Sequence, residues 1–308
     1  MDTTLYLNQL GLAEAPSVSL EGLNQLIHAH QTHIPFENLN VCDLHCGVRL
    51  EEDVLFDKIV LHRRGGYCFE LNGLFCELLR ALGFDAFTVF VRLRNGGYDP
   101  RINHRAILVR LDGMLHYVDV GKGDFEPGIA LPLDGGSYVS DGDSYWVVPD
   151  KEDEEWAWMF CLKADETESK PSLCFGLVAR ETPEFQPHSD ALSESPDSPF
   201  WKRRMITLRT ENGFRYLRGT SYSEVEDGVT TVQKEIPDED SLALIKEKIR
   251  DCALAAPAAP VVFGRHFLPM RSACLSLPPR SAQQLVACFG FLRSVKCLQR
   301  TVVSRAKS

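Results

Sequence analysis

Residues 63–75 read RRGGYCFELNGLF, a stretch in which Cys68 follows two glycines and begins an amphipathic run. A cysteine that only fills a core needs no glycines beside it. Gly65 and Gly66 permit close backbone approach and positive φ values, which a site that admits a substrate requires. If Cys68 lies in the first turn of a helix, the backbone N–H groups and the helix dipole there favour its thiolate. The alternative is a buried structural cysteine, because free cysteines are often buried.

The first segment of the chain has the spacing of helices. Residues 19–33 have apolar residues at helical spacing behind Ser19, a suitable N-cap. After Cys68 the same spacing recurs, and Gly83 is expected to end that helix. The pattern predicts a helical domain over residues 1–86 that carries Cys68. The apolar stripe of the helix that follows Cys68 consists of Leu71, Leu74, Phe75, Leu78, Leu79 and Leu82.

The period changes at Phe87. The stretches AFTVFVRL, HRAILVRL and LHYVDVG are rich in β-branched and aromatic residues, which favours strands. We therefore expect a β-rich domain over residues 87–199, in which 163–199, rich in Pro, Ser, Asp and Glu, forms a loop-rich connection.

The last segment, 200–308, is expected to be mixed α and β, with a basic tail. Asn212-Gly213 predicts a hairpin with a primed turn, and VTTVQKEI predicts a further strand. Residues 238–251, DEDSLALIKEKIRD, have the pattern of a capped amphipathic helix. After Asp251 the chain has basic residues and no acidic one, which fits either a solvated tail or a contact with a polyphosphate ligand.

Asp112-Gly113 lies between two expected strands and is a strong hairpin signal. A two-residue loop pairs Leu111 with Met114 and fixes the register of both strands. A four-residue loop with the same centre gives the same register, whereas a three-residue loop shifts it by one residue.

That register brings His104 and Asp119 to one face of the sheet as diagonal neighbours, roughly 7 Å apart at Cα. The pair supplies a base and the carboxylate that orients it, so a thiolate at Cys68 could complete a Cys–His–Asp triad. Spacing alone does not bring Cys68 to them. The alternatives are a half-buried strand histidine and an aspartate that starts a turn before Gly121.

Composition narrows the class of protein. The chain has 308 residues and a net charge of −10, which argues against a general nucleic-acid binder and a basic membrane-surface protein. It has no transmembrane-length apolar run, and its first residues do not read as a signal peptide, so its ten cysteines are expected to be reduced thiols in the cytoplasm.

CDLHC, residues 42–46, lacks a second ligand pair at zinc spacing, so we expect no metal site. No Walker-type phosphate loop is present in the sequence.

Four blocks of the sequence resemble the signature blocks of the arylamine N-acetyltransferase family, in its bacterial type, and occur in its order. They are HIPFENLNV (33–41), RRGGYCFELNGLF (63–75), NHRAILV (103–109) and YVDVGKG (117–123). The resemblance covers residues 1–292 and is strongest before 125. It implies an α+β fold of a helical bundle, a β-barrel and an α/β lid, whose first two parts form a cysteine-protease-like core.

By that resemblance, Cys68 is the acylated nucleophile, His104 the base and Asp119 the third triad member. Arg64 and Glu37 match a buried ion pair that supports the cysteine loop. The implied reaction is ping-pong. Acetyl-CoA acts as a co-substrate rather than a bound cofactor, and the acceptor is an arylamine, arylhydrazine or heterocyclic amine.

The expected acceptor side consists of Phe36, Tyr67 and Lys122. Where the family has an aromatic residue between two glycines, this sequence has Gly121-Lys122-Gly123. This departure puts the usual preference for neutral arylamines in doubt, and a lysine here could favour an anionic acceptor or a phosphate of CoA.

Three other functions use the same residues or the same fold. An amide synthase of the family would act on a carrier-bound polyketide and refuse free acetyl-CoA. A thiol hydrolase would release acid without an amine. A non-enzymatic binding module has no chemical reason to retain Cys68, His104 and Asp119 together.

Overall fold

The computed structural model describes residues 1–93, 101–123, 127–163 and 166–237. These residues belong to one compact unit, Met1–Pro257. The expected helix over 238–251 and the basic tail lie outside the described residues. The three-domain division, 1–86, 87–199 and 200–308, stays a prediction.

The first segment is helical, as its apolar spacing predicted. Ser19 caps α2 by accepting a hydrogen bond from Gly22 N at 3.1 Å, and Gly83 follows the end of α5 with φ +95°. The helices are α1 (Thr3–Gln9), α2 (Leu20–His33), α3 (Leu39–Cys42), α4 (Glu52–Phe56), the π-helical turn η1 (Asp57–Leu61) and α5 (Cys68–Ala81).

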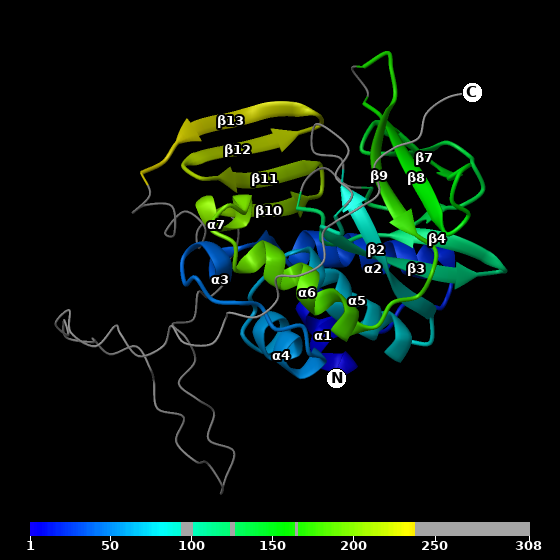
Figure 1. Ribbon diagram of the computed structural model, residues 1–308, viewed down its shortest axis with the longest axis horizontal. Helices are drawn as coiled ribbons and strands as arrows, with labels where there is room; N and C mark the ends of the chain where they lie inside the picture. The colour runs from blue at the N-terminus through cyan, green and yellow to red at the C-terminus, as the bar shows by residue number, and fades with distance from the viewer. Residues whose placement is uncertain (94–100, 124–126, 164–165, 238–308) are drawn as a thin grey trace, which may run out of the picture. The chain divides into compact units, whose positions relative to one another are not determined.

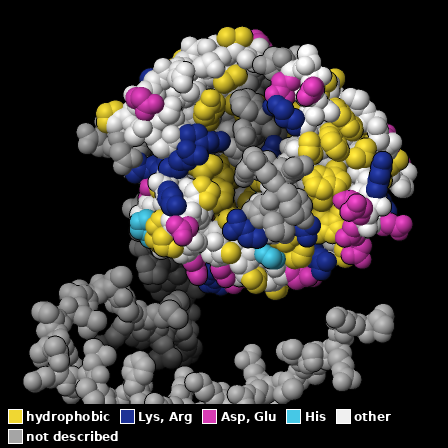
Figure 2. All heavy atoms as spheres, turned by 45° about the horizontal axis from the view of Figure 1, so that its top comes forward, with side chains coloured by type: hydrophobic (Ala, Val, Ile, Leu, Met, Phe, Trp, Pro, Cys, Tyr) yellow, Lys and Arg dark blue, Asp and Glu magenta, His cyan; other side chains and the backbone are white. Residues whose placement is uncertain are grey.

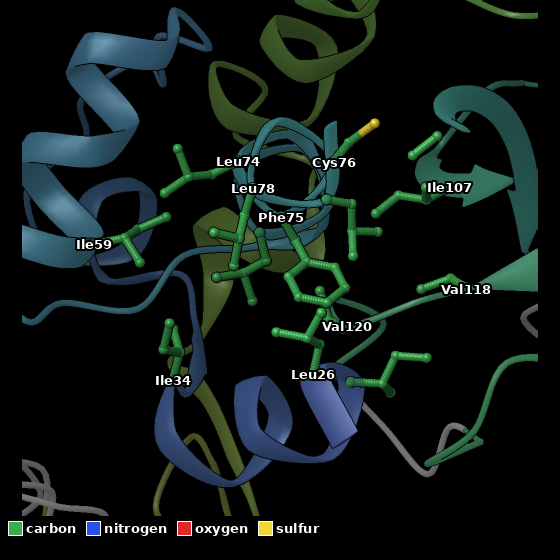
Figure 3. Packing of buried hydrophobic residues seen from close by; sticks show 14 of the residues in the cluster. Leu26, Ile34, Ile59, Leu74, Phe75, Cys76, Leu78, Ile107, Val118 and Val120 are labelled. Carbon is green, nitrogen blue, oxygen red and sulfur yellow. The ribbon is translucent and has the colours of Figure 1, made fainter. Parts of the chain in front are cut away.

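Helix α5 is the centre of the main hydrophobic core. Its apolar stripe points at α2, η1 and the first strands of the barrel sheet, so side chains from all of these pack around one helix (Figure 3). Phe75 and Leu78 are fully buried, with Leu26 of α2 on one side and Ile107 on another. The packing fixes α5 rigidly, and with it the cysteine at its first residue.

The core also buries a histidine. His30 of α2 lies 3.0 Å from Tyr6 Oη through Nε2 and meets the ring of Phe75 edge-on, with centroids 4.9 Å apart. Burial, helped by the charge of His33, lowers the pKa of His30 to about 3. The folded chain therefore holds His30 neutral at a pH where the unfolded chain protonates it.

We expect the free energy of unfolding to fall as the pH drops below about 6.5. There the unfolded state gains a proton that His30 in the folded state does not, so stability changes by about 1.36 kcal/mol per pH unit. The loss between pH 6.5 and 5 is about 2 kcal/mol. Urea unfolding should show this slope in wild type and in Tyr6→Phe, and a shallower slope in the Tyr6→Phe/His30→Leu double variant. An equal slope in all three would contradict the assignment.

The second segment forms an eight-stranded antiparallel sheet in the order β5-β4-β3-β2-β9-β8-β7-β6. Strands β5 and β7, which come from opposite ends of that order, contact each other, so the sheet is nearly closed as a barrel. The α+β class with a barrel is thus confirmed. The strands are β2 (Asp85–Leu93), β3 (His104–Leu111), β4 (Met114–Val118), β5 (Leu131–Pro132), β6 (Tyr138–Ser140), β7 (Asp143–Pro149), β8 (Trp156–Leu162) and β9 (Lys170–Gly176).

Residues 163–199 are more regular than the sequence suggested. They contain β9 and α6 (Thr182–Ser193) instead of a loop-rich connection, and α7 (Pro199–Lys202) begins at their last residue. Pro183 lies in the first turn of α6, where a helix tolerates proline, whereas Pro187 lies inside α6 and Pro171 lies in β9. Glu181 and Glu184 form a capping box, which stabilises that helix end.

A second sheet pairs a short strand from the first segment of the chain with four strands from the last described segment. Its order is β1-β10-β11-β12-β13, with the last four strands side by side in Figure 1. Strand β1 (Phe36–Glu37) pairs with β10 (Met205–Thr210), and Glu37 N also donates to Gly66 O at 2.8 Å. Two residues of β1 therefore connect this sheet to the cysteine loop. The remaining strands are β11 (Gly213–Arg218), β12 (Ser221–Glu226) and β13 (Val229–Glu235).

The hairpin between β10 and β11 forms, but its turn lies one residue earlier than expected. Thr210 pairs with Gly213, so the loop is Glu211-Asn212, and neither residue has a positive φ. The expected primed turn is therefore wrong. Gly213 instead lies against β12, where a Cβ would come 1.9 Å from Val225 O.

The surface of the described residues mixes charge and apolar character. Figure 2 shows one face on which basic, acidic and hydrophobic side chains are interspersed. Within the described ranges, no helix has the length and hydropathy that crossing a bilayer requires.

Candidate active site

Cys68 is the first residue of α5, as the sequence predicted. Tyr67 is the N-cap, and Glu70 Oε2 accepts a hydrogen bond from Tyr67 N at 3.0 Å, which fixes the turn. The Cys68 side chain lies at the positive end of the helix dipole in a site that is almost fully buried. The backbone N–H groups of the first turn and the helix dipole point toward this side chain.

The two glycines before Cys68 permit a close backbone approach. A Cβ on Gly65 would lie 2.0 Å from Pro35 O, and one on Gly66 would lie 2.9 Å from Glu70 Cβ. The loop can therefore pack against the β1 segment only with glycine at these positions. The positive φ that we expected at the glycines falls instead on Arg63, at +51°.

The hairpin that carries His104 and Asp119 has the predicted register. Asp112 and Gly113 have φ values of +50° and +81°, and Leu111 pairs with Met114. This register brings His104 Nε2 to 2.6 Å from Asp119 Oδ2, with both side chains buried.

Asp119 accepts hydrogen bonds on both carboxylate oxygens. Besides His104, Tyr117 Oη donates to Oδ2 at 2.8 Å, while Asn72 Nδ2 and Gly121 N donate to Oδ1 at 2.8 and 3.0 Å. Burial alone would raise the pKa of Asp119, but the charge of His104 and these donors lower it. The carboxylate is therefore ionised and fixed in orientation.

His104 connects the carboxylate to the cysteine. Burial would lower the pKa of His104, but the charges of Asp119 and Cys68 outweigh burial and raise it to about 10. Nδ1 has no partner within normal hydrogen-bond geometry among the described residues, yet Cys68 is close enough to act on the ring. The arrangement can hold the imidazolium of His104 against the carboxylate of Asp119, beside Cys68, at neutral pH.

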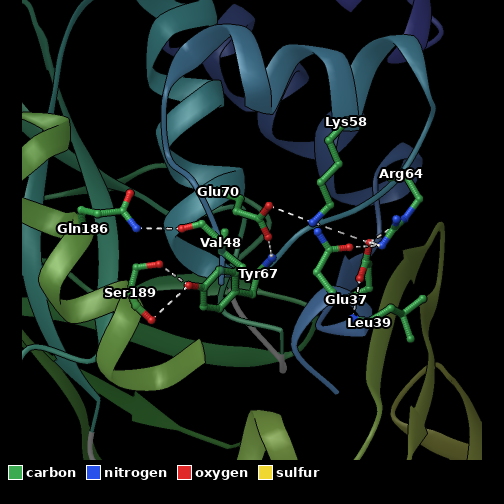
Figure 4. A network of polar contacts seen from close by, with 10 residues as sticks. Glu37, Leu39, Val48, Lys58, Arg64, Tyr67, Glu70, Gln186 and Ser189 are labelled. Atoms are coloured by element: carbon green, nitrogen blue, oxygen red, sulfur yellow. Dashed lines mark hydrogen bonds and ion pairs between the residues drawn. The ribbon is translucent and has the colours of Figure 1, made fainter. Parts of the chain in front are cut away.

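A buried network of charges lies behind the cysteine turn (Figure 4). Arg64 Nη2 lies 2.7 Å from Glu37 Oε1 and 2.9 Å from Asn40 Oδ1, and Lys58 Nζ lies 2.8 Å from Glu70 Oε1. Burial would raise the pKa of Glu37, but the charges of Lys58 and Arg64 lower it. Burial raises the pKa of Glu70 against the opposing charge of Lys58.

Phe36 and Tyr67, expected on the acceptor side, lie in different surroundings. Phe36 lines a small hollow, together with Gln31, Ile34, Val120, Gly123, Thr207, Arg209 and Phe214. Tyr67 is fully buried beneath the cysteine turn, and its hydroxyl bonds to Ser189 Oγ of α6. A direct contact of either residue with an acceptor stays a prediction.

Lys122, the third of these residues, is half-buried in the loop after Asp119. A Cβ on Gly121 would lie 3.1 Å from Cys68 Cα, and one on Gly123 would lie 2.6 Å from the ring of Phe36. The backbone of Lys122 therefore lies between the nucleophile and Phe36.

Comparison with known proteins decides the family. A family model described as N-acetyltransferase matches residues 19–252. The arylamine N-acetyltransferase / N-hydroxyarylamine O-acetyltransferase of Salmonella typhimurium is 31% identical over 237 residues, covering 72% of this chain and 80% of that protein. The chain belongs to the arylamine N-acetyltransferase family.

Solved structures of arylamine N-acetyltransferases have the same fold. The Salmonella typhimurium enzyme superimposes with a TM-score of 0.73 at 25% identity, over 80% of this chain and 89% of that one. The M. smegmatis enzyme gives 0.72 at 26% identity, over 80% and 91% of the two chains.

Sequence reasoning missed several residues of this arylamine N-acetyltransferase site. Asn72 is four residues after Cys68 and so on the same helix face, and Tyr117 is two before Asp119 and on the same strand face. Both spacings were signals that could have identified them. Lys58 and the buried Arg105 had no such local signal, because their places depend on packing between distant segments.

We expect Cys68 to react with iodoacetamide far faster than the other cysteines at neutral pH. It has the helix N-terminus and His104 beside it, whereas burial raises the pKa of Cys76 to about 12 and that of Cys174 to about 11. Peptide mapping after substoichiometric labelling should find the label on Cys68. Even labelling across the cysteines would contradict the thiolate assignment.

Proposed function

We propose that this protein transfers the acetyl group of acetyl-CoA, through a thioester on Cys68, to an arylamine, an arylhydrazine or a heterocyclic amine. The observation that carries the proposal is the 2.6 Å contact of His104 with Asp119 beside a buried helix-start cysteine. Membership of the arylamine N-acetyltransferase family supports acetyl transfer to arylamines.

In the first half-reaction, the Cys68 thiolate attacks the acetyl carbonyl carbon of acetyl-CoA. A C–S bond to Cys68 forms and the C–S bond to CoA breaks, while the His104 imidazolium gives its proton to the departing CoA thiolate. Asp119 holds the ring in orientation and stabilises its charged form. CoA then leaves, with His104 neutral and Cys68 acetylated.

In the second half-reaction, the amine nitrogen attacks the thioester carbonyl. An N–C bond forms, the C–S bond to Cys68 breaks, and neutral His104 takes the proton that the amine loses. The thiolate–imidazolium pair is thereby restored. Acetyl-CoA acts as a co-substrate, and the chemistry needs no bound cofactor and no metal.

We also propose that the protein acts in the cytoplasm, without nucleic-acid or membrane partners. Among the described residues, Cys46, Cys68, Cys76, Cys161 and Cys174 are thiols rather than disulfides, which fits a reducing compartment.

Two-substrate kinetics test the proposal. Initial rates with acetyl-CoA and an aniline-type amine should give parallel double-reciprocal lines, the sign of a ping-pong reaction. Cys68→Ser should abolish turnover, whereas Cys76→Ser, two turns later on the same helix, should retain it. Intersecting lines, or a working Cys68→Ser variant, would overturn the covalent route. Acetate release without amine, at the rate seen with amine, would favour a hydrolase.

We expect Lys122 to set acceptor choice. An ammonium group is strongly hydrated and packs poorly on an aryl ring, so it should raise KM for neutral arylamines more than it lowers kcat. It should favour acceptors with a carboxylate, such as aminobenzoates, by up to about 1 kcal/mol.

Lys122→Phe, assayed with aniline-type and aminobenzoate acceptors side by side, checks this expectation. The ratio of their kcat/KM values should move toward the neutral acceptor by a few-fold. The alternative is that Lys122 extends to solvent and only its stem lines the pocket, in which case the ratio stays unchanged.

A further inference from the structure

Arg105 is a buried cation next to the candidate active site. It follows His104 on β3, and its side chain is 1% exposed, between α5, β2 and α6. Its guanidinium makes only neutral contacts, which are Phe69 O at 3.3 Å, Thr88 Oγ1 at 3.3 Å, Thr182 Oγ1 at 3.1 Å and the Phe185 ring at 4.3 Å.

No carboxylate among the described residues forms an ion pair with Arg105, and its Nε lacks a hydrogen-bond partner there. Burial lowers the pKa of Arg105 to about 10, so the side chain is still charged at neutral pH. An unpaired charge in the interior is costly, and the fold has to balance it with a charge of the opposite sign.

The groups that face Arg105 from the middle of α5 do not provide that charge. Cys76 is near enough to act on it, but burial raises the pKa of Cys76 to about 12 and keeps it a neutral thiol. Glu77 is partly exposed and forms its own ion pair with Arg80 at 2.8 Å.

The groups on α6 are no better placed. Glu181 and Glu184 are both exposed at the start of that helix. Glu184 accepts from Arg180 Nη1 at 3.1 Å, so its charge is already paired at the surface. On β2 the contact with Arg105 is the neutral hydroxyl of Thr88.

The candidate triad, by contrast, has an unbalanced buried charge. A thiolate, an imidazolium and a carboxylate together carry a net charge of −1. Arg105 is linked to this group through two neighbouring residues. Its Nη1 donates to Phe69 O in the turn of Cys68, and its own carbonyl accepts from Asn72 Nδ2 at 2.7 Å. The same Asn72 amide nitrogen donates to Asp119 at 2.8 Å.

We propose that Arg105 is the buried counter-cation of the Cys68–His104–Asp119 group and that its charge favours the Cys68 thiolate. Arg105 does not touch a substrate, so it is a positioning residue rather than a catalytic one. The inference rests on the proposed function only in taking Cys68 as the reactive group.

The test is the pH dependence of iodoacetamide alkylation of Cys68, followed by peptide mapping in folded protein. Arg105→Met should move the midpoint of the pH–rate profile upward by about one unit, which lowers the rate by about tenfold at pH values well below the midpoint. Arg105→Lys should keep the midpoint near that of wild type. Arg110→Met, an exposed arginine on the same strand, is the matched control and should leave it unchanged.

A second pair of variants keeps Arg105 in place and covers the case in which Arg105→Met fails to fold. Thr182→Glu puts a carboxylate beside Arg105 in the first turn of α6, where acidic residues are favoured. It should raise the midpoint by pairing with the guanidinium, whereas Thr182→Gln should not.

The outcomes separate this inference from the proposed function. A midpoint unchanged in Arg105→Met or Thr182→Glu, with only thermal stability lowered, would overturn the counter-cation and leave Arg105 as packing. A shifted midpoint that Arg105→Lys restores would support it. Alkylation needs no acetyl-CoA, so a shift in a protein that forms no acetyl-enzyme would support the inference while overturning the proposed function.

Discussion

Asp119→Asn is expected to lower the rate of Cys68 acylation by about 10⁴-fold while the chain stays folded. Asn has the shape of Asp but no charge, so it cannot stabilise the imidazolium of His104. Its amide would also face the Asn72 amide nitrogen and Gly121 N, which donate to Oδ1 in the native site. The amide has two orientations. In one its nitrogen faces the buried donors, which lose their acceptor, and in the other its nitrogen faces His104, which loses its preferred tautomer.

Stopped-flow measurement of CoA release in the first turnover gives this rate. The circular dichroism spectrum and thermal midpoint of the variant should stay close to those of wild type. Asp85→Asn, on an exposed side chain of β2, is the control and should acylate normally. A variant of Asp119 within about tenfold of wild type would show that this carboxylate is structural.

Glu37→Gln is expected to lower the free energy of unfolding by about 3–5 kcal/mol. The substitution leaves Arg64 and Lys58 buried with Glu70 as their only nearby carboxylate, so one positive charge is uncompensated. Gln keeps an acceptor for Leu39 N, which donates to Glu37 Oε2 at 2.7 Å in the native network. The loss therefore reports the charge rather than the backbone contact.

Urea unfolding measures the effect, with Glu51→Gln as the matched control. Glu51 pairs with Arg49 at 2.9 Å on the surface, where such pairs contribute about 0–1 kcal/mol. The pKa of Glu37 is lowered on folding, so its stabilisation is present above about pH 4.5 and is lost as the pH falls below that value. A loss for Glu37→Gln no larger than for Glu51→Gln would contradict the role of the network.

The parts of the site that the sequence predicted are those that short-range geometry determines. The Asp112-Gly113 turn fixes a register, and the register alone brings His104 to Asp119. Cys68 begins its helix for local reasons. The two glycines end the segment before it, and the apolar stripe of α5 starts after it. The resemblance to a family was needed only to bring the cysteine and the hairpin together.

The parts that the sequence did not predict depend on contacts between distant segments. Arg105 reads as a surface residue of an alternating strand, and only the packing of α5 and α6 over β3 buries it. Helix α6 was missed because its sequence is rich in proline and polar residues, which are typical of loops. Only the structure shows which turn of a helix each of them occupies. The contact of the Tyr67 hydroxyl with Ser189 of α6 also joins segments far apart in the sequence.

The central claim is that Cys68 carries the acetyl group between donor and acceptor. Intact-mass spectrometry after brief incubation with acetyl-CoA and no amine tests it most directly. The account predicts one added acetyl group per chain, mapped to the peptide of Cys68, lost when an arylamine is added and absent from Cys68→Ser. A protein that turns over arylamine but shows no acetyl group on Cys68, or carries it on another residue, would contradict the account.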